Sequence, residues 1–210
     1  MTPNEYFDAI YCVTLDRRPD RKAQAEEEFA KHNITVEFIS GVDGLTLDVT
    51  GMQSGDGTPV SKGDLGCSMS HLKVARLCKE RGHKRVLVLE DDAVFHDDFN
   101  SLFTEYLPEV PENWDFLYLG GNHDKGGMEK VSEHISKIFY SYTTHAYSMT
   151  EKVYDAVIDV LSKKGEKVDI AIGSLHGVFN SYVFRPHLAY QRAGFSDILE
   201  RDVDYPFLKD

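Results

Sequence analysis

Three consecutive carboxylates, Glu90-Asp91-Asp92, follow directly after the apolar run 86–89. Such a run is typical of a buried strand, and open α/β sheets bind ligands at the carboxyl ends of their strands. Because side chains alternate along a strand, we expect Glu90 and Asp92 to share a face while Asp91 points elsewhere, unless the loop turns. Paired carboxylates suit Mg²⁺ or Mn²⁺, which can bridge a diphosphate. The competing interpretation is a solvated acidic turn.

A basic cluster, residues 17–22, follows the first apolar run of the chain. The whole chain has 23 basic and 35 acidic residues, a net charge of −12, which argues against general affinity for nucleic acid or anionic membranes. A phosphate-bearing ligand would therefore need a local group of positive charges. The planar guanidinium groups of this cluster, beside a helix N-terminus, could bind a phosphate. The competing interpretation is a solvated loop whose arginines pair with nearby acids.

A glycine-containing segment, residues 62–71, leads into a third candidate site. Gly63 and Gly66 permit close approach of the backbone to a ligand, and Ser70 and His71 can reach that ligand from the first helical turns. The segment has no Walker pattern, and a histidine early in a helix also commonly has a structural role.

Apolar, β-favouring runs alternate with helical patterns along the 210 residues. We expect an α/β fold of one domain, residues 1–210, with a mixed, mainly parallel central sheet, helices on both faces and some antiparallel strands late in the chain. The longest irregular connection, residues 40–63, is rich in glycine. Strands are expected at 9–15, 34–39, 85–89, 116–119, within 138–149 and at 178–184, and helices at 20–32, 65–81, 97–107 and 150–161.

The three cysteines, Cys12, Cys67 and Cys78, are too few and too unevenly spaced for a disulfide framework or a closed thiolate metal site. The sequence also shows no leader peptide and no apolar run long enough to span a membrane. These features predict a protein of the cytoplasm, with no integral membrane segment.

Several runs resemble, in order and spacing, those of glycosyltransferase family 25, the lipooligosaccharide and collagen galactosyltransferase family. The resemblance extends over nearly the whole chain and is closest to compact bacterial or viral members. The runs that carry it are residues 11–21, 41–44, 63–71 and 89–93, followed by 115–121, 144–148, 168–169 and 186–198.

The resemblance implies a GT-A-type fold, a UDP-galactose or UDP-glucose donor, and inversion at the anomeric carbon. The acceptor would be a hydroxyl group on a glycan, a lipooligosaccharide or a protein. By matching position, Glu90 and Asp92 would hold Mn²⁺ or Mg²⁺, and Asp91 would belong to the same metal and diphosphate motif. The nucleotide pocket would be lined by Thr14, Leu15, Arg17 and Asp43, with Ser70 and His71 nearby.

An inverting transferase needs a base for the acceptor hydroxyl proton, and we expect Asp169 to be that base because the family has a comparable acid there. A helix N-cap is the competing interpretation of Asp169. His187 is expected to be a wall of the pocket rather than a further metal ligand.

Two other functions fit parts of the sequence. Residues 121–124 spell GNHD, a short signature of metallophosphoesterases, but no Asp-x-His follows the first strand. A non-catalytic nucleotide-sugar or glycan-binding module is the second alternative, since fold alone does not establish turnover.

Overall fold

The computed structural model describes residues 1–123 and 126–206, and its centre is an eight-stranded sheet in the order β2-β1-β3-β8-β5-β9-β7-β6. Two crossovers place β1 and β3 side by side in the sheet, with Val13 opposite Glu90. The strands are β1 (Ala9–Thr14), β2 (Glu37–Ser40), β3 (Arg85–Glu90), β5 (Phe116–Tyr118), β6 (Met128–Lys130), β7 (Ile135–Ile138), β8 (Ala146–Thr150) and β9 (Ser181–Phe184).

Most strands of the sheet run in one direction. β1 is parallel to β2 and β3, and β5 is parallel to β9. β8 is antiparallel to both β3 and β5, and β7 is antiparallel to both β9 and β6, so only β7 and β8 oppose the other six. The expected mixed, mainly parallel sheet with late antiparallel strands is confirmed.

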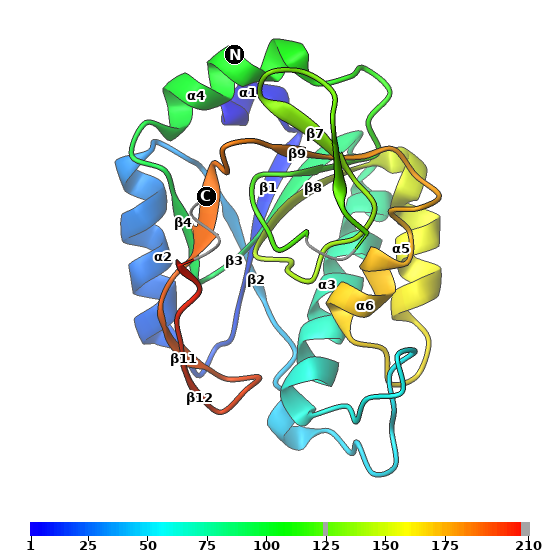
Figure 1. The fold of residues 1–210 in the computed structure, drawn as a ribbon. Coiled ribbons are helices and arrows are strands. Elements are labelled where there is room, and N and C mark those ends of the chain that lie inside the picture. The colour runs from blue at the N-terminus through cyan, green and yellow to red at the C-terminus, as the bar shows by residue number, and fades with distance from the viewer. Residues whose placement is uncertain (124–125, 207–210) are drawn as a thin grey trace.

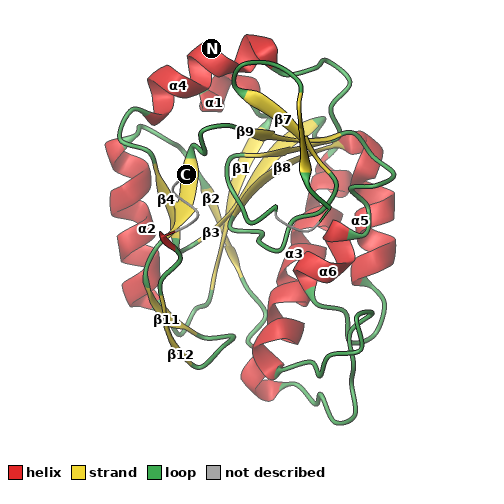
Figure 2. Cartoon of the chain, viewed as in Figure 1, coloured by secondary structure: helices red, strands yellow, loops and turns green. Residues whose placement is uncertain are grey.

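Helices cover both faces of the sheet, as Figures 1 and 2 show. One buried core joins α1 (Pro3–Tyr6), α2 (Pro19–Lys31) and α4 (Phe99–Tyr106) to the sheet. A second core, on the other face, joins α3 (Lys62–Arg81), α5 (Tyr154–Leu161) and α6 (Val168–Gly173). Three short 3₁₀ helices complete the helical elements of the described chain: η1 (Gly44–Thr46), η2 (Leu107–Glu109) and η3 (Glu151–Val153). Within the described residues, no helix is both long and apolar enough to cross a bilayer.

The first turn of α3 forms one side of the later site. Ser61 caps the helix: its hydroxyl accepts from the Asp64 amide, and the Asp64 carboxylate accepts from the Ser61 amide in return. The helix therefore begins at Lys62, before the start predicted from the sequence, and includes both glycines of the segment. Gly66 is needed there because a Cβ would lie 2.7 Å from the carbonyl oxygen of Val42.

The chain after β9 returns over the carboxyl ends of β1 and β3. There, β10 (Ala189–Gln191) pairs with β4 (Ala93–Phe95), and β11 (Gly194–Ser196) pairs with β12 (Arg201–Val203). The sequence pattern did not predict these three-residue strands, since so short a run contains too few alternations to be recognised.

The single tryptophan, Trp114, lies just before β5, at the amino ends of the parallel strands and thus opposite the Glu90-Asp91-Asp92 turn. It is buried, and its indole N–H donates to the hydroxyl of Tyr6 at 2.8 Å. This residue ties α1 to the core on the side of the sheet away from the Glu90-Asp91-Asp92 turn.

Candidate functional site

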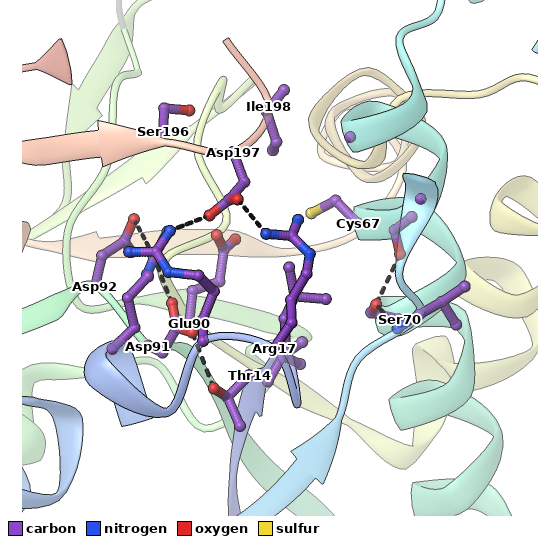
Figure 3. Close-up of a pocket in the computed structure, with 18 of the residues that line it drawn as sticks. Thr14, Arg17, Cys67, Ser70, Glu90, Asp91, Asp92, Ser196, Asp197 and Ile198 are labelled. Carbon is purple, nitrogen blue, oxygen red and sulfur yellow. Dashed lines mark hydrogen bonds and ion pairs between the residues drawn. The ribbon is translucent and has the colours of Figure 1, made fainter. Parts of the chain in front are cut away.

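Two adjoining pockets lie at the carboxyl ends of β1 and β3. The first, which we call the arginine pocket, is lined by the end of β1, the α2 entry, the first turns of α3 and the Glu90-Asp91-Asp92 turn (Figure 3). The second, the aspartate pocket, contains Asp169 of α6 and the segment 142–145. Both pockets are lined by Cys67, Glu90, Gln191, Ser196 and Ile198.

All three acids of the turn line the arginine pocket. Asp91 accepts a hydrogen bond from the Thr14 hydroxyl at 3.0 Å. Arg21 pairs with both Asp91 and Asp92, at 2.5 and 2.9 Å. The chain turns immediately after β3, which is the exception that the sequence analysis allowed, and Asp91 therefore lies beside Asp92 on Arg21.

One buried oxygen of the three acids, Oδ1 of Asp92, has no hydrogen-bond partner among the described residues. Asp92 accepts from the Gln191 amide at 3.1 Å through Oδ2, whereas its buried Oδ1 has no hydrogen-bond partner. Glu90 accepts from the hydroxyl of Thr144 at 2.7 Å, and its Oε1 lies 3.5 Å from Nε2 of His71.

Burial and mutual repulsion perturb this cluster. Burial raises the pKa of Asp91 to about 6, against the opposing effect of Arg21. Burial and the charge of Glu90 likewise raise the pKa of Asp92. For Glu90 burial acts in the same direction, but the nearby His71 and Thr144 outweigh it and hold the pKa of Glu90 below its usual value. Carboxylates crowded in this way favour a cation among them.

The arginines that face the acids converge on another carboxylate, Asp197. Arg17 donates to it at 2.7 Å, Arg18 at 2.5 Å, and Arg21 lies 3.5 Å away. Arg17 also pairs with Asp43 at 3.0 Å. Three guanidinium groups are therefore gathered around one anionic group inside a pocket.

The other predicted pocket residues fall into two groups. Thr14, Leu15, Arg17, Ser70 and His71 line the arginine pocket directly. Asp43 does not line the pocket, but its Oδ2 pairs with Arg17, which does. The other carboxylate oxygen of Asp43, Oδ1, accepts from the Leu45 amide at the start of η1.

Ser70 and His71 are both fixed by buried contacts. The Ser70 hydroxyl accepts from the Val42 amide at 2.8 Å and donates to the Gly66 carbonyl, which fastens α3 to the β2 loop. Nδ1 of His71 lies 3.0 Å from the Tyr147 hydroxyl. The side chains that face the pocket are thus held by neighbours outside it.

Asp169 lies in the first turn of α6 and lines the aspartate pocket. Burial raises its pKa to about 6, although its Oδ1 accepts from the Ile170 amide at 2.9 Å. The alternative of a helix N-cap does not hold, since Lys167 occupies the cap position.

Two histidines singled out by the sequence lie away from the pocket walls. His187 is buried behind them, with its ring centroid 5.6 Å from that of His123, and it lines neither of the two pockets. The expectation of a pocket wall is wrong because the backbone of 188–189 pairs with Leu119. In the GNHD run, His123 is likewise buried and Asp124 lies outside the described residues, so the phosphoesterase alternative gains no support.

The sequence matches the profile of glycosyltransferase family 25 (LPS biosynthesis protein) over residues 7–165. This chain belongs to glycosyltransferase family 25. The expectation of family membership, drawn from the resemblance, is confirmed.

Curated members of family 25 include active and inactive proteins. The chain is 34% identical over 164 residues to procollagen lysyl hydroxylase and glycosyltransferase of Acanthamoeba polyphaga mimivirus, covering 67% of this chain and 18% of that protein. It is 27% identical over 162 residues to procollagen galactosyltransferase 1 of Danio rerio, covering 67% and 26%. It is 30% identical over 162 residues to inactive glycosyltransferase 25 family member 3 of Mus musculus, covering 69% and 27%. The match thus spans about a quarter or less of these relatives.

Among solved structures, the chain is similar to a glycosyltransferase involved in the glycosylation of the major capsid of PBCV-1. The TM-score is 0.44 with 12% identity, covering 73% of this chain and 64% of that chain. It is also similar to UDP-glucose pyrophosphorylase complexed with UDP-glucose, with a TM-score of 0.42 and 11% identity, covering 87% and 74%.

Sequence reasoning did not assign roles to several residues that complete the pockets. Arg18, Arg21 and Asp197 were within runs singled out by the sequence, but their convergence depends on contacts between distant segments. Thr144 and Gln191 lay in the family-like runs without any local signal that they would hold Glu90 and Asp92.

Proposed function

We propose that this chain transfers a hexose, galactose or glucose, from a UDP-sugar to a hydroxyl group on a glycan, a lipooligosaccharide or a protein, with inversion at the anomeric carbon. One observation carries the proposal: the arginine pocket and the aspartate pocket meet at Glu90. A donor in the first and an acceptor in the second would bring their reacting atoms together at that boundary.

The arginine pocket suits the diphosphate of the donor. Guanidinium groups offer paired donors that match phosphate oxygens. Arg17, Arg18 and Arg21 already reach a single carboxylate, that of Asp197, so they are placed to hold a diphosphate in its stead. The proposed nucleotide pocket around them is lined by Thr14, Leu15, Ser70, His71 and Asp91, and Asp43 would support it from outside by pairing with Arg17.

The acid turn fits Mn²⁺ or Mg²⁺. The fit rests on the buried, unpaired Oδ1 of Asp92 and on the oxygens of Glu90, which together offer the hard donors that these ions prefer. Glu90 and Asp92 would hold the ion, and when bound it would offset the charge that develops on the departing diphosphate. Asp91 would keep Arg21 oriented toward that diphosphate.

Asp169 would act as the base. Its carboxylate faces the aspartate pocket, and a pKa of about 6 leaves it ionised at neutral pH while still basic enough to accept a proton. As the acceptor oxygen forms its bond to the anomeric carbon, the bond from that carbon to the diphosphate breaks on the opposite face. The hydroxyl proton passes to Asp169.

The named relatives support galactose and a protein acceptor among the possibilities, because one is a procollagen galactosyltransferase and another combines procollagen lysyl hydroxylase with a glycosyltransferase. The second candidate function is a nucleotide-sugar or glycan-binding module without turnover, which the inactive mouse relative favours. The acid turn and Asp169 favour the transferase.

A donor screen tests the proposal. Purified protein with Mn²⁺ would be offered UDP-galactose, UDP-glucose, UDP-N-acetylglucosamine and a GDP-sugar, and the released nucleoside diphosphate would be measured with and without EDTA. Slow cleavage of one UDP-hexose that EDTA abolishes is the expected result. Binding of UDP without cleavage or transfer, over a broad acceptor panel, would favour the binding module instead.

A further inference from the structure

His71 is a buried imidazole with one nitrogen that makes no hydrogen bond. Its side chain is 0% exposed, and Nε2 makes no hydrogen bond. Its other nitrogen, Nδ1, is engaged by the Tyr147 hydroxyl at 3.0 Å. Within the described chain, the one charged atom beside Nε2 is Oε1 of Glu90, at 3.5 Å, which is longer than a hydrogen bond. Nε2 and that carboxylate can therefore both turn to a cation that enters from the pocket.

Two further ligand atoms surround that nitrogen. Cys67 precedes His71 by four residues on α3, so both side chains lie on one face of the helix. Cys67 Sγ, His71 Nε2 and one carboxylate oxygen of Glu90 all lie within 4.8 Å of one another. Among the described residues, this is the one cluster of histidine, cysteine and acidic side chains with such spacing.

The distances approach those of a tetrahedral zinc site. Zinc bonds of about 2.0 Å to nitrogen and oxygen place those two atoms about 3.3 Å apart. Nε2 of His71 and Oε1 of Glu90 are 3.5 Å apart. The Cys67 sulfur lies within 4.8 Å of both atoms, and the half-buried Cys67 side chain lines both pockets.

We propose that Cys67, His71 and Glu90 form a binding site for Zn²⁺, with a fourth position open to the pocket. Sulfur and imidazole ligands select Zn²⁺ over Mn²⁺ and Mg²⁺, which prefer oxygen. On binding, the Cys67 thiol gives its proton to solvent as the sulfur–zinc bond forms, and nothing is oxidised. Tyr147 fixes the imidazole from behind, as outer partners of metal-bound histidines do.

The site shares Glu90 with the Mn²⁺ or Mg²⁺ site of the proposed function. Zinc bound to Cys67 and His71 would withdraw Glu90 from Asp92 and inhibit transfer. This consequence, unlike zinc binding itself, rests on the proposed function.

Cobalt absorption tests the site without any assay of activity. Co²⁺ added to the reduced protein should give the near-ultraviolet band of thiolate-bound cobalt, and one equivalent of Zn²⁺ should remove it. The matched control is Cys78→Ala, on the core-facing side of the same helix, which should keep the band. Cys67→Ser and Cys67→Ala should both lose it and bind Zn²⁺ at least tenfold more weakly by calorimetry. Cobalt binding without the thiolate band, or unchanged zinc affinity in both Cys67 variants, would overturn the proposal.

Inhibition is measured separately. Zinc should lower the Mn²⁺-supported rate of the wild type and of Cys78→Ala, while Cys67→Ser, compared with its own zinc-free rate, should need at least tenfold more zinc. If the wild-type protein binds zinc through Cys67 but cleaves no donor, the proposed zinc site holds and the proposed transferase activity is refuted. Transfer that zinc does not inhibit, despite binding at Cys67, would overturn the shared role of Glu90.

Discussion

Arg17 donates a hydrogen bond to Asp197 at 2.7 Å, although the two residues are 180 positions apart in the chain. Arg17 follows β1, and Asp197 follows β11, so this pair fastens the returning segment across the pocket that β1 and β3 open. The same carboxylate contacts Arg18 and Arg21. A ligand phosphate that binds these arginines must compete with Asp197.

Removal of that competitor should tighten nucleotide binding. We expect Asp197→Asn to bind UDP about two- to fivefold more tightly, since partly exposed ion pairs contribute up to about 1 kcal/mol. Isothermal calorimetry would measure the change. Asp20→Asn is the matched control, because Asp20 pairs with Arg18 but is exposed and lines neither pocket. Weaker binding in Asp197→Asn would show instead that the carboxylate orients the arginines for the ligand.

The acid turn should be needed for turnover but not for folding. Asp92→Asn is expected to lower metal-dependent transfer by about 100-fold or more, in the range seen when one group that stabilises the transition-state charge is lost. Its melting temperature should stay close to that of the wild type, because burial already disfavours the charge of Asp92 and Arg21 keeps Asp91 as a partner. Rates over a Mn²⁺ titration and a thermal melt would check both parts. Wild-type turnover would refute the metal assignment.

Asp169 should govern the pH dependence of transfer. A base with a pKa of about 6 is protonated below that pH, so kcat/KM should rise with pH through about 6 and then level off. Asp169→Asn should abolish transfer yet leave UDP affinity unchanged, as UDP binds in the neighbouring pocket. A joint loss of transfer and UDP binding would point to a structural role.

The same substitution should stabilise the fold at neutral pH. The pKa of Asp169 is raised from 3.8 to about 6 in the folded protein, so the folded state binds the proton more tightly than the unfolded chain does. The resulting stability is present below 3.8 and is lost as the pH rises through about 6. Asp169→Asn avoids this loss, which amounts to about 1–3 kcal/mol. Thermal melts of both proteins from about pH 4 to pH 7 should therefore diverge as the pH rises, and parallel curves would contradict the assignment.

The contact between α3 and the loop after β2 should be intolerant of a single methyl group. In Gly66→Ala the new Cβ would lie 2.7 Å from the Val42 carbonyl and 2.8 Å from the Gly44 amide, so backbone must shift. We expect a loss of about 1–3 kcal/mol in the free energy of unfolding, together with weaker UDP binding. Gly177→Ala is the control, since nothing lies within 4 Å of its Cβ position. Denaturant unfolding would measure the stability of both variants. Equal stability would show that the close approach of Gly66 to the backbone of Val42 and Gly44 is unimportant.

The central elements were predictable because their signals are local. The apolar run before Glu90 and the helical stripe from Leu65 to Cys78 each indicate their own secondary structure. β3 lies where its pattern predicts, and α3 contains the whole predicted helix but begins at Lys62. By contrast, β6, β10, β11 and β12 have three residues each and form only where a partner strand is supplied by the fold.

The site was predictable only in part for the same reason. Glu90, Asp91 and Asp92 stand together in the sequence, so their position after a strand indicated a site. The convergence of Arg17, Arg18 and Arg21 on Asp197 required segments from the two ends of the chain to meet, which no local pattern records. His187 was misplaced because the backbone pairing of 188–189 with Leu119 is likewise a long-range contact.

Trp114 has a practical value that follows from its position. Trp114 is the sole tryptophan and is buried against Tyr6 at the amino ends of the parallel strands, whereas both pockets lie at their carboxyl ends. It should therefore emit the same fluorescence whether or not a nucleotide is bound. Its emission should change only when α1 and the core beneath it come apart. The fluorescence of Trp114 thus reports unfolding without an added label, and it should not change during a ligand titration.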